Sequence, residues 1–161
     1  MKKSLVIGGS GFLGAALAGE LKQRGEDVRV FDLNRNPQVF SIIGDLREPD
    51  DVLRACEGMD TVYHTAALVD WGPRSRQRLM DINVTGTRNV IAACRANGVK
   101  RLVYTSTVDV VFDGRPIANG DESLPYPRRH LDDYGATKAQ AEREVLAANG
   151  LNVWLTDGAT P

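Results

Sequence analysis

The chain has 161 residues, of which 42% are hydrophobic and 25% charged, and this length and balance are typical of one globular domain. Its formal net charge of -1 provides no general attraction to nucleic acid or to an anionic membrane surface, so we expect no nucleic-acid partner. No apolar run approaches the ~20 residues of a membrane span, and the N-terminal apolar run is too short for a signal peptide, which favours a soluble cytoplasmic protein.

Short apolar runs alternate with longer amphipathic ones along the chain. We predict strands at 4–9, 27–32, 39–45, 60–68, 99–107 and 151–156, and helices at 11–25, 48–58, 74–98 and 132–150. Gly25 stands at the expected C-terminal cap of the first helix. This alternation predicts an α/β fold in which a doubly wound parallel sheet carries helices on both faces.

Two features of this pattern bear on function. A loop rich in Gly, Pro and Asp at 113–129 is long for a compact domain, and such loops are often functional. Cys56 and Cys94 fall in predicted helices without paired spacing, so we expect two buried thiols. No cluster of His, Cys, Asp and Glu has the spacing of metal ligands, and we expect no metal.

The first predicted strand runs into a glycine-rich segment. Gly9, Gly11 and Gly14 form G-x-G-x-x-G, with Gly8 in front, and a predicted helix follows. Glycines in this context make a tight turn, let a pyrophosphate approach the backbone and let the helix pack on the strand. The helix N-terminus then offers free N–H groups to the phosphates. The alternative is a glycine turn of purely structural importance.

Asp32 ends the second predicted strand, 18 residues after Gly14. A carboxylate at this place accepts hydrogen bonds from the adenosine ribose hydroxyls and repels a 2′-phosphate, which favours NAD over NADP. Two alternatives to this interpretation stay open. Asp32 could be a solvated turn residue, and Arg35 nearby could pair with a 2′-phosphate.

The segment "YGATK" places Tyr134 and Lys138 four residues apart on a predicted helix, so that both side chains lie on one side. A tyrosine with a pKa of about 10 is a poor base at neutral pH. A neighbouring ammonium stabilises the phenolate and lowers this pKa, which suits the pair to alcohol–ketone chemistry.

Together with the glycine loop, these motifs resemble the extended short-chain dehydrogenase/reductase superfamily, also called the NAD-dependent epimerase/dehydratase superfamily. Within it, the chain is most similar to the 3β-hydroxysteroid dehydrogenase/sterol dehydrogenase group. The similar stretches occur in the order of the family and reach to about Gly150: "GGSGFLG", "GDLRE", "HTAAL", "NVTGTRNV", "YTST", "NGDESLPYP" and "YGATKAQAE".

The resemblance implies a site residue by residue. It implies that NAD contacts the glycine loop, the "GDL" pair, the "HTAAL" loop and the catalytic lysine, which are Gly8, Gly11, Phe12, Leu13, Gly14, Asp32, Asp45, Leu46, Ala66, Ala67 and Lys138. It implies catalytic roles for Tyr134 and Lys138, with a strand-end hydroxyl that helps hold the substrate carbonyl. That hydroxyl belongs to Thr107 or to Ser106, and the sequence favours Thr107 without excluding Ser106.

Other residues of these stretches are expected to be architectural. Asn83 matches a helix asparagine near the active site, and His64 reads as a packed strand histidine. Trp71 either packs under a loop or caps the nicotinamide end of a pocket.

The similarity to the family ends near the C-terminus. Family members continue with an Arg-Pro turn and a substrate-binding region, whereas this chain has "LTDGATP" and ends at Pro161. We therefore expect an NAD-binding Rossmann domain over 1–161 without the substrate-binding C-terminal region. Such a chain should bind NAD weakly, oxidise little steroid alcohol and self-associate through exposed sheet surface.

Three functions remain open. The first is an NAD-dependent 3β-hydroxysteroid-type dehydrogenase, or its cofactor domain, acting on a small alcohol or ketone of steroid type. The second is a nucleotide-sugar epimerase or dehydratase, or a flavonoid-type reductase; the stretch "VVFDG" after the fifth strand argues against an epimerase. The third is a dinucleotide-binding module without catalysis.

Overall fold

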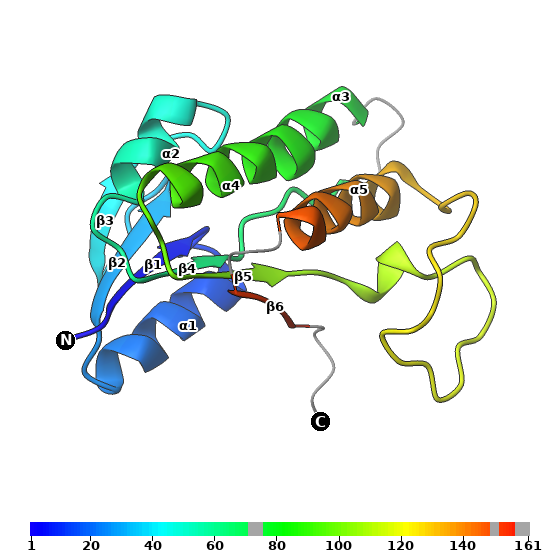
Figure 1. Ribbon diagram of the computed structural model, residues 1–161, viewed down its shortest axis with the longest axis horizontal. Coiled ribbons are helices and arrows are strands. Elements are labelled where there is room, and N and C mark those ends of the chain that lie inside the picture. Colours follow the sequence, from blue (N-terminus) through cyan, green and yellow to red (C-terminus); the bar gives the residue numbers. More distant parts are fainter. Residues whose placement is uncertain (71–75, 149–151, 157–161) are drawn as a thin grey trace.

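Six parallel strands form one sheet in the order β3–β2–β1–β4–β5–β6 in the computed structural model, which describes residues 1–70, 76–148 and 152–156 (Figure 1). The order reverses between β1 and β4, which are hydrogen-bonded neighbours, as predicted for a doubly wound sheet. The strands are β1 (Lys3–Ile7), β2 (Asp27–Asp32), β3 (Phe40–Ile43), β4 (Thr61–His64), β5 (Arg101–Thr105) and β6 (Asn152–Thr156).

Helices cover both faces of the sheet. Helix α1 lies on one face, and α2, α4 and α5 lie on the other (Figure 1). The described helical segments are α1 (Phe12–Gln23), α2 (Pro49–Ala55), α3 (Arg76–Leu79), the π-helix η1 (Met80–Thr85), α4 (Gly86–Ala96), the 3₁₀ turn η2 (Val108–Val110) and α5 (Asp133–Ala147). None of the helices in the described part of the chain is long and apolar enough to cross a membrane.

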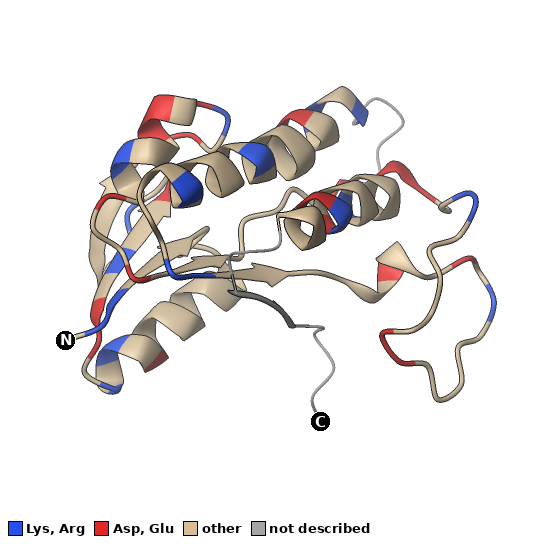
Figure 2. Cartoon of the chain, in the orientation of Figure 1, with Lys and Arg blue, Asp and Glu red and all other residues tan. Residues whose placement is uncertain are grey.

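Two apolar clusters hold these layers together. Alternate strand residues point to opposite faces, so Val6 and Val30 pack with α1, whereas Leu5 and Phe31 belong to the larger cluster on the other side. Cys56 and Cys94 are free and buried in this larger cluster, as predicted. Charged side chains lie on the helices, at strand ends and on the long loop before α5, with both signs interspersed (Figure 2).

The ends of α1 follow from its sequence. Gly11 caps the N-terminus with extended backbone, and the backbone N–H of Gly25 donates to the carbonyl of Lys22 after the last turn. Gly25 has φ +81, a left-handed conformation that glycine adopts without steric cost. The predicted capping role of Gly25 is therefore confirmed.

The predicted helix at 74–98 is wrong in detail. Over its described part it consists of α3, the π-helical segment η1 and α4. A π-turn inserts an extra residue into the hydrogen-bond ladder and rotates the side chains beyond it, and such turns often accompany functional sites. The start of this predicted helix and Trp71 lie outside the described residues.

Candidate active site

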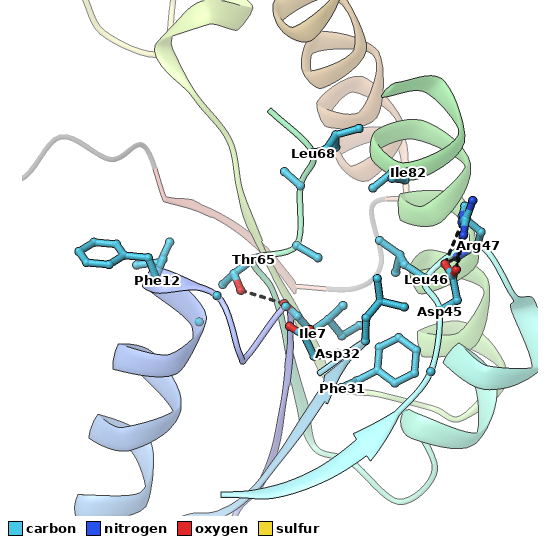
Figure 3. Close-up of a pocket in the computed structure, with 18 of the residues that line it drawn as sticks. Ile7, Phe12, Phe31, Asp32, Asp45, Leu46, Arg47, Thr65, Leu68 and Ile82 are labelled. Carbon is cyan, nitrogen blue, oxygen red and sulfur yellow. Dashed lines mark hydrogen bonds and ion pairs between the residues drawn. The ribbon is translucent and has the colours of Figure 1, made fainter. Parts of the chain in front are cut away.

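A cavity of about 470 Å³ opens where β1, β2 and β4 end (Figure 3). Every residue predicted to contact the cofactor lines it, except Lys138: Gly8, Gly11, Phe12, Leu13, Gly14, Asp32, Asp45, Leu46, Ala66 and Ala67. The carboxyl ends of parallel strands at a reversal of strand order are the usual ligand site of such sheets. The fold thus gathers residues from four separate segments around one space.

The glycine loop is packed too tightly for side chains. Gly8 has φ +81, and a Cβ on it would lie 2.7 Å from the backbone nitrogen of Ala66. A Cβ on Gly14 would lie 2.2 Å from the carbonyl oxygen of Gly8, so the first turn of α1 lies directly against the loop. On Gly11 a Cβ would approach only the carbonyl oxygen of Gly8, at 3.3 Å, and this backbone remains open to the cavity that it lines.

Asp32 is held in place at the end of β2. Its two carboxylate oxygens accept from the backbone N–H of Ser10 at 3.0 Å and from that of Asn34 at 3.1 Å. A carboxylate has about four acceptor positions, so each oxygen retains capacity for a hydroxyl donor from the cavity. Arg35 is exposed and does not belong to the cavity lining.

Asp45 and Arg47 form an ion pair at one side of the cavity (Figure 3), with Nη2 2.5 Å from Oδ2. The hydrogen bond from Arg47 lowers the pKa of Asp45. The neighbouring Leu46 and Ile82 supply apolar surface on this side of the cavity. The contribution of Ile82 and Arg78 to the lining was missed by the sequence analysis, since both come from the misread helix at 74–98.

Lys138 is buried at the carboxyl end of β5, on the same edge of the sheet as the cavity. Its side chain is 3% exposed, its Nζ donates to the carbonyl of Thr105 at 2.7 Å, and it lies 4.2 Å from the centre of the Tyr104 ring. Burial lowers the pKa of Lys138 to about 8, and the charge of Glu142 partly opposes this change. The lysine therefore contacts the end of β5 rather than the cavity.

Tyr134 differs from the expectation in its acidity. Burial raises its pKa, the charges of Asp109 and Asp132 add to this increase, and a hydrogen bond with Thr107 opposes it. The predicted lowering of the Tyr134 pKa by Lys138 is thus wrong for the protein without cofactor. The physical reason is that the Lys138 ammonium is directed to the Thr105 carbonyl.

The two strand-end hydroxyls point to different partners. Thr107 donates to the carboxylate of Asp109 at 2.9 Å and interacts with Tyr134. Ser106 instead donates to the carboxylate of Glu142. Of the two residues that the sequence left open, Thr107 is therefore the one beside Tyr134.

Asn83 connects the cavity to the Tyr134 helix. Its Oδ1 accepts from the backbone N–H of Leu68 at 2.8 Å, and its Nδ2 donates to the carbonyl of Leu68 at 3.0 Å and to Thr137 Oγ1 at 3.3 Å. Asn83 is 2% exposed and lies in the π-helical segment η1. The architectural role expected for it agrees with these contacts.

The sequence analysis missed two carboxylates beside the predicted catalytic residues. Glu142 lies one helical turn beyond Lys138, a spacing that could have indicated it. Asp109 lies in a 3₁₀ turn, and no local pattern marks it. His64 is a packed strand residue, as predicted, with 1% exposure.

Several curated proteins with similar sequences are named as steroid or sterol dehydrogenases. The chain is 43% identical to a 3-beta-hydroxysteroid dehydrogenase of Mycolicibacterium neoaurum, over 98% of this chain and 46% of that protein. It is 45% identical to a 3 beta-hydroxysteroid dehydrogenase/Delta 5→4-isomerase of Mycobacterium tuberculosis, over 98% and 45%. It is 43% identical to the mouse sterol-4-alpha-carboxylate 3-dehydrogenase, decarboxylating, over 92% and 41%. The chain therefore spans less than half the length of these curated relatives.

Solved structures show the same fold. A short-chain dehydrogenase/reductase superfamily protein from Agrobacterium tumefaciens with bound NAD has a TM-score of 0.85 and 29% identity, over 96% of this chain and 48% of that one. The UDP-glucose 4-epimerase of Thermus thermophilus in complex with NAD has a TM-score of 0.81 and 28% identity, over 96% and 53%. Residues 5–159 match the sequence pattern of the 3-beta hydroxysteroid dehydrogenase/isomerase family, and with this match over nearly its whole length the chain belongs to that family.

Proposed function

We propose that this chain binds NAD in the cavity at the ends of β1, β2 and β4. We further propose that it is the cofactor-binding part of a dehydrogenase that moves hydride between NAD and a secondary alcohol or ketone of steroid type. The convergence of the predicted cofactor residues on one cavity carries this proposal. Tyr134 and Thr107 follow β5 in the chain, and β5 is the neighbour of β4 in the sheet.

The chemistry of the cavity fits NAD. The backbone of Gly11 and the N-terminus of α1 offer N–H groups to a pyrophosphate. Asp32 keeps acceptor capacity for ribose hydroxyls and opposes a 2′-phosphate, which supports NAD rather than NADP. Leu46 and Ile82 provide apolar surface for an adenine ring.

The residues beyond β5 are suited to proton transfer. Bound NAD would accept hydride from the alcohol carbon. In its phenolate form Tyr134 would take the alcohol proton and become a phenol, while the Thr107 hydroxyl holds the reacting oxygen. Lys138, already buried, is the residue to which the family likeness assigns the nicotinamide ribose. If the Lys138 ammonium turned from the Thr105 carbonyl toward Tyr134, its positive charge would favour the Tyr134 phenolate.

The sequence relatives support the substrate class. Several relatives at 40–45% identity are named as steroid or sterol dehydrogenases, and others as members of short-chain dehydrogenase/reductase family 42E, whereas the sugar-nucleotide epimerases among the solved structures are less similar in sequence. A steroid-type alcohol is therefore the substrate that we propose, with a nucleotide sugar as the second candidate.

NAD binding is tested by calorimetric titration of the chain. Asp32→Ala should weaken NAD at least about tenfold, because hydrogen bonds to a charged group contribute about 1.5 kcal/mol or more. Asp27→Ala is the matched control, since it makes the same change at the far end of β2 and should leave NAD affinity unchanged. Tighter binding of NADP than of NAD by the unchanged chain would refute the cofactor assignment.

The catalytic assignment is tested with a secondary steroid alcohol and NAD in a version of the chain that also carries a C-terminal substrate-binding region. Tyr134→Phe keeps the ring and removes the proton path, so NAD affinity should persist while NADH formation is lost. Activity that survives in Tyr134→Phe would exclude this role. NAD binding without any turnover in the version that carries a substrate-binding region would favour a non-catalytic binding module instead.

A further inference from the structure

A buried carboxylate lies on the helix that carries the predicted catalytic residues Tyr134 and Lys138. Glu142 is on α5, one turn beyond Lys138, and is 7% exposed. It accepts a hydrogen bond from the Ser106 hydroxyl and a second from the phenol of Tyr126 at 2.6 Å. Glu142 thus joins the end of β5, the catalytic helix and the loop between them.

Tyr126 is the part of the long loop that meets this carboxylate. Residues 113–123 are all exposed, whereas Tyr126 is half-buried. The guanidinium of Arg143 lies 4.1 Å from the centre of the Tyr126 ring, so α5 holds the ring by stacking as well as by the hydrogen bond. The loop, which extends beyond α5 in Figure 1, is therefore attached at Tyr126, near the loop's C-terminal end, to helix α5, which also carries Tyr134 and Lys138.

The two hydrogen bonds have separate consequences for the site. The Ser106 hydroxyl donates its hydrogen bond to Glu142, and Thr107 is the hydroxyl that interacts with Tyr134. Because Tyr126 donates to the same carboxylate, the loop that connects β5 to Tyr134 has a fixed path. The negative charge also lies near buried Lys138 and favours its ammonium form.

We propose that Glu142 is a positioning residue that fastens the 113–131 loop and the Ser106 hydroxyl to the catalytic helix. It touches neither cavity nor reacting group and acts through Ser106 and Tyr126. This inference rests on the proposed function, because the catalytic assignments of Tyr134 and Thr107 give the positioning its purpose. The attachment of the loop itself can be measured without cofactor or substrate.

Limited trypsin digestion measures the attachment. Arg128 and Arg129 are exposed just beyond Tyr126, and cleavage there is identified by fragment mass. Tyr126→Phe keeps the stacked ring and removes only the hydrogen bond. Loss of a hydrogen bond to a charged acceptor should raise cleavage about tenfold, since proteolysis follows local opening. Glu142→Gln should raise it similarly, and the double variant should add little to either change.

Glu144→Gln is the matched control. It makes the same substitution on the same helix, where the carboxylate pairs with Arg88 on the outer surface. It should leave cleavage after Arg128 and Arg129 unchanged. Tyrosinate absorbance provides a second readout, because burial and the Glu142 carboxylate raise the pKa of Tyr126 to about 12. Glu142→Gln should make a tyrosine ionise at lower pH, and Glu144→Gln should not.

The catalytic consequence is measured with NAD and a secondary steroid alcohol, in a version of the chain that also carries a C-terminal substrate-binding region. Glu142→Gln should lower kcat several-fold while the Kd for NAD stays within about twofold. Wild-type cleavage in both Tyr126→Phe and Glu142→Gln, or an unchanged kcat in Glu142→Gln, overturns the inference. A wild-type chain that neither binds NAD nor turns over instead counts against the proposed function, and cleavage and absorbance then decide the inference alone.

Discussion

Mild acid should destabilise the protein through one buried histidine, His64 on β4. Its Nε2 lies 3.0 Å from Thr87 Oγ1, and the Thr87 hydroxyl donates its own proton to the Asn83 carbonyl at 2.6 Å. Nε2 must therefore carry the proton and donate it to Thr87. Nδ1 has no hydrogen-bond partner among the described residues, so a second proton on the ring would face no acceptor there.

The structure sets the size and the sign of this effect. Burial, with a smaller contribution from the charge of Lys138, lowers the pKa of His64 from 6.5 to about 3. Between about pH 6.5 and about pH 3, His64 binds a proton in the unfolded chain but stays neutral in the folded chain. The free energy of unfolding therefore falls as the pH falls. At about 1.4 kcal/mol per pKa unit, the loss is ~2 kcal/mol at about pH 5 and ~4 kcal/mol near pH 3.

Urea unfolding followed by circular dichroism tests this prediction. His64→Phe keeps a ring against Tyr104, whose centre lies 5.5 Å from that of His64, and removes the titrating group. The fall in unfolding free energy between about pH 7.5 and about pH 5 should be ~2 kcal/mol smaller in His64→Phe than in the wild type. Equal falls in the wild type and His64→Phe would refute the reasoning.

Two further predictions concern the candidate site. Gly14→Ala should destabilise the protein by about 1–3 kcal/mol and abolish NAD binding in calorimetry, because its Cβ would lie 2.2 Å from the Gly8 carbonyl oxygen. Gly19→Ala, on the same helix with only ordinary contacts at 3.6 Å, should be neutral or stabilising, and equal thermal shifts in the two variants would contradict this argument. Asp109→Asn removes a charge that, after burial, raises the pKa of Tyr134, so the pH–rate profile of alcohol oxidation should move to lower pH; a move to higher pH would disprove this role.

The amino-acid sequence determined the features that depend on neighbours along the chain. Alternating apolar and amphipathic segments predicted the parallel sheet, because strands buried on both faces must be apolar and their connections must be helical. The glycine spacing and the acidic residue at the end of β2 predicted residues of a cofactor site, and the structure places these residues around one cavity. This succeeded because parallel strands carry their following loops to one edge of the sheet, so Gly11, Asp32 and Ala66 meet although they are distant in sequence.

The tertiary structure alone decided the features that depend on contacts between distant segments. The π-helical segment that places Asn83 departs from a sequence pattern that reads as one continuous helix. Ser106 turns to Glu142, 36 residues away, and leaves Thr107 to Tyr134. The pKa of Tyr134 is raised rather than lowered, because burial and Asp109 act on the phenol while Lys138 is bound to a backbone carbonyl. Spacing along a helix shows which side chains share a side, but only packing shows which atoms they bind.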